Sequence, residues 1–305
     1  MRDILIIGGG AAGMTAGLYA ARAGLQTLLI ESNFIGGQTS TTDLVMNYPG
    51  FPEGIGGPEL MMRFEEQAQK FGLIIEYAET SKLELAGVKK RAVTSDGREW
   101  SARCVILAMG ASPRKLGVPG EDQFYGRGVS YCATCDGAFY RGKHVAVVGG
   151  GDTAVEDALY LARASSVTVI HRRADFRAKG HAVAEMGKLS QVDYRMEQAV
   201  ESIEQAENGL RLNIKDVTND ARSQLDVAAL FVAVGTDPNT SRVRGLIDLD
   251  EQGFVRAGED GFTSIPGVFA AGDVRTKTLR QVITAASDGA NAAYQAGVYL
   301  DSIGS

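Results

Sequence analysis

The hydrophobic pattern of the chain begins with a short apolar run that leads directly into a cluster of glycines. Residues 4–7 carry no polar side chain, which is typical of a strand buried on both faces of a parallel sheet. A helix-like segment over 12–23 and a second apolar run over 27–30 follow, and Glu31 ends that run. This order predicts a β–α–β unit.

The same arrangement returns in the middle of the chain. Residues 145–148 are again entirely apolar, 155–164 are helix-like, and 167–170 form a closing apolar run. The two glycine clusters begin at Gly8 and Gly149, which are 149 − 8 = 141 positions apart. The sequence therefore predicts two copies of the unit.

The segments between the two units are less regular. Apolar residues recur near a 3.6-residue period over 58–72, which predicts a helix. Residues 76–102 alternate in a way that indicates short strands, with a hairpin turn at Asp96-Gly97. An apolar strand over 104–109 follows, and we interpret Cys104 as a buried core thiol.

Beyond the second unit, residues 180–230 are charged and alternating, which predicts a β-rich finish to that unit. Apolar strands at 230–234 and 268–271 come next. A long Ala-rich helix is expected to begin at 279–281 and to end near Tyr299, and its small residues permit close packing.

Both glycine clusters match the pattern of a dinucleotide-binding turn, G-x-G-x-x-G or G-x-G-x-x-A, in a strand–turn–helix context. The glycines allow a tight turn, let a pyrophosphate approach the backbone and let the helix pack on the strand. The helix N-terminus adds unpaired N–H groups. The candidate residues of these turns are Gly8, Gly10, Gly13, Gly149, Gly151, Asp152, Thr153 and Ala154.

The residues that end the two units predict different nucleotides. Glu31 follows the first glycine of its motif by 31 − 8 = 23 positions, where a carboxylate usually accepts the ribose hydroxyls. The second unit has His171, Arg172 and Arg173 at that place, with Arg177 one turn later. Guanidinium groups bind a 2′-phosphate, which a carboxylate would repel. We therefore expect NADPH on the second unit; the alternative is a solvated basic run.

Composition limits the classes of partner. The apolar content of 45% and charged content of 22% are ordinary for a soluble globular protein. The net charge of −6 gives no reason to expect nucleic acid or an anionic membrane surface as a partner. No signal-peptide pattern precedes the first strand, and no apolar stretch reaches the ~20 residues of a membrane span. We expect a cytoplasmic protein.

Cys132 and Cys135 are the candidate redox centre. Two cysteines separated by two residues close into a small disulfide or open into a dithiol, and such pairs often contain a reactive thiolate. Half of a zinc site is an alternative, but the remaining Cys104 and the three histidines are not at ligand spacing. A structural disulfide is a second alternative, against which a reducing cytosol argues.

NADPH needs a relay to reduce a disulfide, and a flavin is the usual one. We therefore assign FAD to the first unit, since Glu31 suits an unphosphorylated ribose. Chain breakers at 112–120 predict a first crossing between domains, and the breaker at 237–239 leads us to place the return crossing near 239–245. The expected fold is α/β, with two Rossmann-like nucleotide-binding domains of the three-layer ββα type, the second inserted in the first. FAD would bind residues 1–115 plus 246–305, and NADPH would bind residues 116–245, which also carry the Cys pair.

The chain resembles the low-molecular-weight thioredoxin reductases of bacteria and archaea over nearly its full length, with a thin match across 178–230. The glutathione reductase group differs, because its Cys pair lies just after the first nucleotide unit, and residues 31–60 of this chain contain no Cys. The resemblance rests on residues 8–13, 36–38, 47–51, 132–136, 149–154, 171–177, 272–273 and 280–281.

The resemblance implies a homodimer that reduces thioredoxin through Cys132 and Cys135. It also implies that Asp136 acts as a general acid–base in dithiol formation, although a cap at a helix start is its simpler role. Thr153 would lie near the NADPH pyrophosphate. The polar residues implied around the ribityl chain and isoalloxazine of FAD are Gln38, Asn47, Asp273, Arg280 and Gln281. The glycines Gly36, Gly37, Gly110 and Gly235 complete the candidate cofactor-binding set.

The order of motifs also has a mechanistic implication. Cys135 lies 149 − 135 = 14 positions before Gly149, so the dithiol and the nicotinamide site would share one domain. Both would need access to the flavin on the other domain and would have to alternate there. This predicts a rotation of one domain relative to the other. Alternative functions are the same chemistry on a glutaredoxin-like or peroxidase-linked partner, and a dithiol oxidase. A ferredoxin–NADP reductase or a flavin-binding sensor would have no use for the Cys pair.

Overall fold

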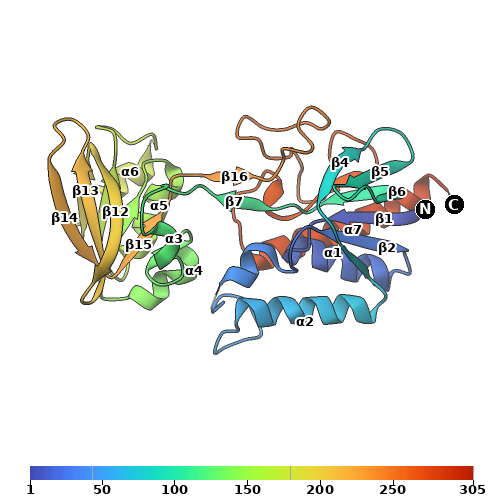
Figure 1. The fold of residues 1–305 in the computed structure, drawn as a ribbon, viewed down its shortest axis with the longest axis horizontal. Helices are drawn as coiled ribbons and strands as arrows, with labels where there is room; N and C mark the ends of the chain where they lie inside the picture. The colour runs from blue at the N-terminus through green and yellow to red at the C-terminus, as the bar shows by residue number, and fades with distance from the viewer. Residues whose placement is uncertain (43, 179, 305) are drawn as a thin grey trace. The chain divides into compact units, whose positions relative to one another are not determined.

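The computed structural model describes residues 1–42, 44–178 and 180–304, and the chain forms two compact units. The first unit joins Met1–Ser112 to Asp237–Ser305, and the second is Pro113–Thr236 (Figure 1). The second unit is thus inserted in the first. The two connecting segments pair as short strands, β7 (Ala111–Pro113) and β16 (Thr236–Pro238).

The return connection lies earlier than the sequence suggested. The second unit ends at 236 instead of 245, because the residues that follow it already bond to the first unit. Asn239 Nδ2 donates to the carbonyl oxygen of Met109 at 2.9 Å, and Thr240 Oγ1 donates to that of Gly253 at 2.8 Å. The first connection differs from the expected position by 115 − 112 = 3 residues.

In the described part of the first unit, seven strands form one sheet in the order β3-β2-β1-β6-β5-β4, and β17 also pairs with β6. Strands β3, β2, β1, β6 and β17 are parallel, and β5 and β4 are added as antiparallel neighbours. The strands are β1 (Arg2–Ile7), β2 (Thr27–Glu31), β3 (Ile74–Tyr77), β4 (Thr80–Glu84), β5 (Lys90–Thr94), β6 (Glu99–Leu107) and β17 (Val268–Ala270).

Three helices pack on one face of this sheet: α1 (Ala11–Arg22), α2 (Gly57–Lys70) and α7 (Val282–Ser302). Figure 1 shows α1 and α7 beside β1. Ile4 and Ile6 of β1 face these helices, whereas Leu5 and Ile7 pack into the core on the opposite face. Burial on both faces explains why residues 4–7 are entirely apolar.

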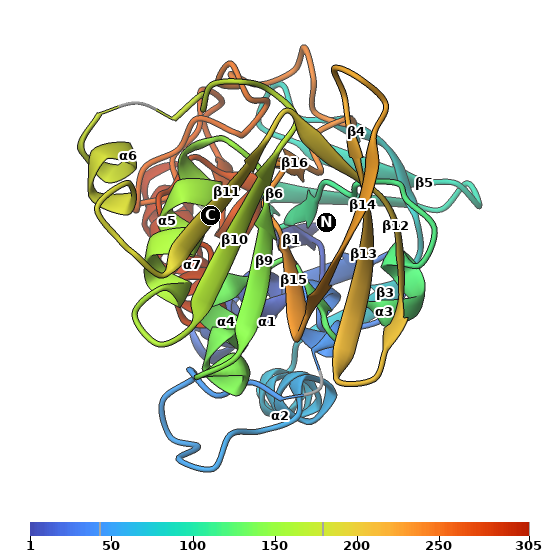
Figure 2. The same cartoon turned by 90° about the vertical axis from the view of Figure 1, so that its left-hand side faces the viewer.

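The second unit has a parallel five-stranded sheet in the order β11-β10-β9-β15-β8 and an antiparallel sheet of β12, β13 and β14. Val145 and Val147 of β9 pack against α5 (Asp152–Leu161), whereas Ala146 and Val148 pack against the antiparallel sheet. Figure 2 shows β9 and β10 between α5 and the strands β13 and β14. The unit therefore has three layers, as predicted.

The strands of the second unit are β8 (Val129–Ser130), β9 (His144–Val148), β10 (Ser166–His171), β11 (Val192–Met196), β12 (Gln198–Ala206), β13 (Gly209–Asp216), β14 (Arg222–Val227) and β15 (Ala229–Val232). Its helices are α3 (Glu121–Phe124), α4 (Ala133–Asp136), α5 (Asp152–Leu161) and α6 (His181–Met186), with the 3-10 helix η2 (Gly137–Tyr140).

Two details differ from the sequence prediction. The segment expected to be β-rich begins with helix α6, which at six residues is too short for its apolar period to be recognised. Helix α7 begins at Val282 and not at Leu279, because Gln281 is its N-cap in a reciprocal capping box with Thr284. No helix in the described ranges has the length and apolarity to cross a membrane.

Candidate functional site

The glycine turn after β1 leaves space for a ligand at one position and forbids side chains at two others. Gly8 has φ +105°, and a Cβ on it would lie 2.4 Å from the carbonyl oxygen of Ala108. A Cβ on Gly13 would lie 1.9 Å from the carbonyl oxygen of Gly8, so only glycine lets α1 pack against β1 here. At Gly10, by contrast, no described heavy atom lies within 4 Å of the Cβ position. The backbone there is open to a pyrophosphate.

Two further segments bond to this turn. Glu31, at the end of β2, accepts a hydrogen bond from the backbone N–H of Gly9 through Oε2 at 2.7 Å. Gly36 donates its N–H to the carbonyl oxygen of Gly9 at 2.8 Å, with φ +115°. A Cβ on Gly37, the first residue of the 3-10 helix η1 (Gly37–Thr41), would lie 3.7 Å from the Cα of Gly10. Glu31, Gly36 and Gly37 are therefore all beside the turn.

The polar candidates from distant parts of the first unit also approach one another. Asn47 Nδ2 donates to Gln281 Oε1 at 2.9 Å, and Gln38 Nε2 donates to the carbonyl oxygen of Ala111 at 3.3 Å. Gly110 has φ +67°, and the space at its Cβ position is open within the described chain. These contacts join the segments before α2 to the start of β7 and to the N-cap of α7.

Asp273 lies in the 3-10 helix η3 (Gly272–Val274), directly after β17. Because β17, β6 and β1 are parallel neighbours, η3 and the glycine turn share the carboxyl edge of the sheet, where α/β folds bind ligands. A Cβ on Gly272 would lie 2.8 Å from that of Ala12, which shows how closely the two loops pack.

Two buried polar atoms at this edge have no hydrogen-bond partner among the described residues: Asp273 Oδ1 and Arg280 Nε. Burial raises the pKa of Asp273, an effect that Lys277 and Arg280 partly offset. Burial also lowers the pKa of Arg280, whose guanidinium carbon lies 4.2 Å from the centre of the Phe254 ring. Unpaired buried polar groups are costly and demand an explanation. A polar cofactor that binds at this edge would provide their partners, so the site fits the flavin dinucleotide expected from the sequence.

In the glycine turn of the second unit, close packing leaves no room for a side chain at two of the glycines. A Cβ on Gly150 would lie 2.2 Å from Cε1 of His171, and the carbonyl oxygen of Gly150 accepts the backbone N–H of Arg177 at 2.7 Å. A Cβ on Gly149 would lie 2.3 Å from the carbonyl oxygen of Ala233. Helix α5 then begins at Asp152, an exposed residue followed by the exposed Thr153. The turn therefore presents the N-terminus of α5 to solvent.

Two further candidates of the second unit lie apart from this opening. Ala154 is fully buried, and the carbonyl oxygen of Gly235 accepts the backbone N–H of Arg114 at 2.9 Å.

The basic residues after β10 divide into two kinds. Arg172, Arg173 and Arg177 are exposed, and none of their side chains forms an ion pair with another described residue. The Nη2 atom of Arg177 lies 3.4 Å from the Cβ position of Gly151, beside the turn. His171 is buried and stacks on Phe176. Burial, and secondarily the neighbouring arginines, lower its pKa. His171 thus supports the glycine turn, whereas the three exposed arginines can bind an anionic ligand.

Cys132 and Cys135 form a disulfide, with their Cα atoms 5.3 Å apart. Cys132 is the N-cap of α4, and its sulfur accepts the backbone N–H of Cys135 at 3.2 Å. Its own N–H donates to Ser130 Oγ at 3.0 Å, and Ala133 between the cysteines is 1% exposed. The core thus fixes the short helix, while Cys132 and Cys135 are only partly buried.

Asp136 ends α4 and is partly buried. Burial raises the pKa of Tyr140, and the charge of Asp136 raises it further. A Cβ on Gly137 would lie 2.7 Å from Leu161 of α5, which ties the residue after Asp136 to the nucleotide-binding helix.

Among the described residues, no group of three or more His, Cys, Asp or Glu side chains could hold a metal ion. Cys104 is a buried free thiol, as predicted, and burial raises its pKa to about 12.

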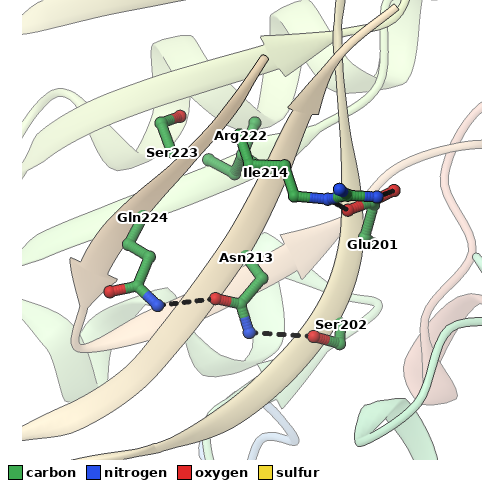
Figure 3. Close-up of a pocket in the computed structure, with 7 residues that line it drawn as sticks. All are labelled: Glu201, Ser202, Asn213, Ile214, Arg222, Ser223 and Gln224. Atoms are coloured by element: carbon green, nitrogen blue, oxygen red, sulfur yellow. Dashed lines mark hydrogen bonds and ion pairs between the residues drawn. The ribbon is translucent and has the colours of Figure 1, made fainter. Parts of the chain in front are cut away.

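A hollow of about 350 Å³ lies on the β12–β14 sheet of the second unit (Figure 3). Its polar residues satisfy one another: Arg222 pairs with Glu201, and Asn213 donates to Ser202 Oγ and accepts from Gln224. None of its seven lining residues is a candidate site residue.

The sequence analysis missed three residues that support the Asp273 turn: Arg275, Lys277 and Asp288. Asp288 lies in the middle of α7 and is 5% exposed. An acidic residue at a buried position of an Ala-rich helix was the available indication, since an acid is seldom buried without partners. Its partners are 11 and 13 positions away, so no local pattern identifies them.

The fold and the residues around the two glycine turns assign the chain to a class of protein. It belongs to the family described as pyridine nucleotide-disulphide oxidoreductase, whose model matches residues 2–289. The resemblance to the thioredoxin reductase group rested in part on the two glycine turns, the Cys pair and the basic loop. Its relatives confirm that resemblance.

The chain is 45% identical over 302 residues to the "Thioredoxin reductase" of Mycolicibacterium smegmatis, covering 98% of this chain and 97% of that protein. It is 44% identical to the "Bifunctional thioredoxin reductase/thioredoxin" of Mycobacterium leprae, covering 98% of this chain and 66% of that protein. Among solved structures, the thioredoxin reductase of Streptococcus pyogenes has a TM-score of 0.93 and 42% identity, with 99% of each chain covered.

Proposed function

We propose that this chain is an NADPH-dependent flavoprotein that reduces the disulfide of thioredoxin. The observation that carries the proposal is the Cys132–Cys135 disulfide at the start of a short helix, in a unit that also has a dinucleotide turn flanked by unpaired arginines. The related protein of Mycobacterium leprae bears a name that joins a thioredoxin reductase to a thioredoxin, which supports thioredoxin as the partner.

FAD and NADPH are the cofactors. The first unit would hold FAD, with its pyrophosphate against Gly10 and its polar groups near Asp273 and Arg280. The second would hold NADPH, with Thr153 near the pyrophosphate and the arginines on the 2′-phosphate. When bound, the flavin accepts a hydride from NADPH and passes an electron pair to sulfur.

The two cysteines perform the exchange with the partner. One thiolate of the reduced pair attacks a sulfur of the partner's disulfide, so that a mixed disulfide forms and the partner's other sulfur leaves as a thiolate. The second thiolate then attacks the mixed disulfide. The Cys132–Cys135 bond forms again and the partner leaves as a dithiol, so two electrons pass and one disulfide replaces another.

Asp136 is the residue that moves the proton. Asp136 is the residue directly after Cys135 at the end of helix α4, which supports a role in protonating the sulfur that leaves when the pair is reduced. A carboxylate within reach of the leaving sulfur is the requirement for general acid–base catalysis.

The assembly and location extend the proposal. The first unit (1–112 and 237–305) is the FAD-binding domain and the second (113–236) is the NADPH-binding domain with the Cys pair. The enzyme works as a homodimer in the cytoplasm, on a protein partner and not on nucleic acid or membranes. The names of the relatives support the catalytic part of this proposal, and the net charge of −6 supports the choice of partner class.

The test is a coupled assay of the FAD-loaded protein with NADPH and oxidised thioredoxin. Wild-type protein should reduce thioredoxin, and Cys132→Ser and Cys135→Ser should each abolish that reaction while NADPH still bleaches the flavin. Glutaredoxin in place of thioredoxin tests the alternative partner. Thioredoxin reduction that survives either cysteine change would refute the proposed route.

A further inference from the structure

Gln198 of the second unit carries a buried hydrogen-bond acceptor that the rest of the described chain does not satisfy. It is the first residue of β12, and its Oε1 atom is buried with no hydrogen-bond partner among the described residues. A buried polar atom without a partner is costly, and in native structures it usually has a ligand, an ion or a water as its partner. Since Gln198 belongs to the second unit, it needs an explanation separate from that of Asp273 and Arg280.

The backbone places Gln198 beside the basic loop that follows β10. Strands β10 and β11 are parallel, and His171 at the end of β10 pairs with Met196 at the end of β11. The next residue, Glu197, has φ +55° and connects β11 to β12. Its backbone N–H donates to the carbonyl oxygen of Arg173 at 3.3 Å. Gln198 therefore begins its strand at the carboxyl edge of the parallel sheet, next to Arg173.

The strand pattern directs the side chain of Gln198 to the layer between the two sheets of the unit. Side chains two positions apart on a strand share a face, so Gln198 lies on the same face of β12 as Val200. Val200 is buried in the core between the parallel and antiparallel sheets, in one cluster with Ile170 of β10. The residue after Ile170 is the last of β10, so this core ends where the basic loop begins. The unpaired Oε1 is thus buried at the end of the core that borders the loop.

A phosphorylated dinucleotide on this loop would bring its adenine to the same edge. The exposed arginines of the loop are the proposed partners of the 2′-phosphate, and the adenine is attached to the neighbouring carbon of the same ribose. An adenine presents its 6-amino donor beside the N7 acceptor, and the oxygen and NH2 group of a glutamine amide match that edge. The Oε1 acceptor requires a donor, which the 6-amino group supplies and a phosphate does not.

We propose that Gln198 is a specificity-determining residue whose Oε1 accepts a hydrogen bond from the 6-amino group of the NADPH adenine. This inference rests on the proposed function, because it requires NADPH on the second unit, and it adds the choice of base. A purine with a carbonyl oxygen at that position would place two acceptors against each other. A site that hydrogen-bonds a ligand group rejects an analogue that lacks the group, because the buried partner is left unpaired.

The test measures the Kd of two dinucleotides for the FAD-loaded protein by isothermal titration calorimetry. NADP+ carries the 6-amino group, and nicotinamide hypoxanthine dinucleotide phosphate carries a carbonyl oxygen in its place. Wild-type protein should bind the hypoxanthine form about tenfold more weakly, since one buried hydrogen bond is lost. Gln198→Met, which has a similar volume and no amide, should bind both forms with the same Kd. Gln205→Met, on an exposed position of the same strand, is the matched control and should keep the tenfold preference.

A carboxylate variant keeps the acceptor and removes the donor of the amide. Gln198→Glu should retain the preference for NADP+, because a carboxylate accepts from the amino group and repels the carbonyl oxygen. This variant tests the proposal even if Gln198→Met fails to fold. Equal affinity of the wild-type protein for the two forms would overturn the proposal, as would an undiminished preference in Gln198→Met or a lost preference in Gln198→Glu. Wild-type protein that binds no NADP+ would instead refute the proposed function.

Discussion

Replacement of Asp288 by asparagine should destabilise the first unit strongly. The change removes the charge that pairs with Arg275 and Lys277, both of which stay buried with 6% exposed side chains. In the Asp288→Asn variant, Oδ1 of the asparagine can accept some of the four hydrogen bonds that the carboxylate accepts. Its NH2 group is a hydrogen-bond donor, however, and would face the two cations and the Gly272 N–H, which are donors as well. Breaking a buried ion pair from one side costs about 3–5 kcal/mol; we expect about 3 kcal/mol, since one acceptor oxygen remains.

This free energy converts to a measurable shift in Tm. The first unit has 112 + 69 = 181 residues, and a domain of that size loses about 2–4 °C in Tm for each kcal/mol. Asp288→Asn should therefore lower the Tm by roughly 6–12 °C in differential scanning calorimetry of the FAD-loaded protein. Asp301→Asn, on the exposed end of the same helix, is the matched control and should leave the Tm unchanged. A shift of Asp288→Asn no larger than that of the control would show that the cluster does not stabilise the unit.

Three further predictions concern the two glycine turns and the basic loop. Gly13→Ala should lower the Tm sharply because its Cβ would lie 1.9 Å from a carbonyl oxygen, whereas Gly10→Ala should leave the Tm of the apoprotein unchanged and weaken FAD binding. Arg172→Ala combined with Arg177→Ala should raise the KM for NADPH about tenfold or more through lost charge-assisted hydrogen bonds, with the KM for NADH unchanged. The pKa of His171 is lowered by burial, so the unfolded state binds more protons below the ordinary value of about 6.5. Its contribution to stability is complete above that pH and is lost as the pH falls toward the folded pKa; His171→Gln should remove this part of the pH dependence in urea unfolding.

Each of these has a clear contrary result. Equal Tm losses for the two glycine variants would mean that Gly10 serves packing and not ligand approach. Parallel rises in KM for both nucleotides would place the arginines away from the 2′-phosphate. An unaltered pH dependence after His171→Gln would show that other groups cause the acid destabilisation.

Local patterns predicted the parts of the fold that short segments of sequence determine. The apolar run 4–7 is buried on both faces of the sheet, and such two-sided burial admits no polar residue. The hairpin turn at Asp96-Gly97 joins β5 to β6, as expected. Each of these features depends on neighbours within a few positions.

Features that depend on distant contacts could not be predicted. The start of helix α7 is a local exception: it was expected three residues early, because its N-cap Gln281 is not one of the residue types that usually cap a helix. The Asp288 cluster joins a helix interior to a loop before it. The acid in an Ala-rich segment was an indication, but its partners Arg275 and Lys277 lie 13 and 11 positions away, so no local pattern identifies them. The interior position of His171, in contrast with the arginines beside it, follows from the close approach to Gly150.

The measurement that tests the central claim most directly is the stoichiometry of electron transfer under anaerobic conditions. The FAD-loaded protein is mixed with a limiting amount of NADPH and an excess of oxidised thioredoxin, and NADPH loss and new thioredoxin thiols are both counted. The account predicts two thiols for each NADPH oxidised in the wild-type protein, and none in Cys135→Ser although the flavin is still bleached. NADPH oxidation without new thiols in the wild-type protein, or thiols formed by Cys135→Ser, would contradict the account.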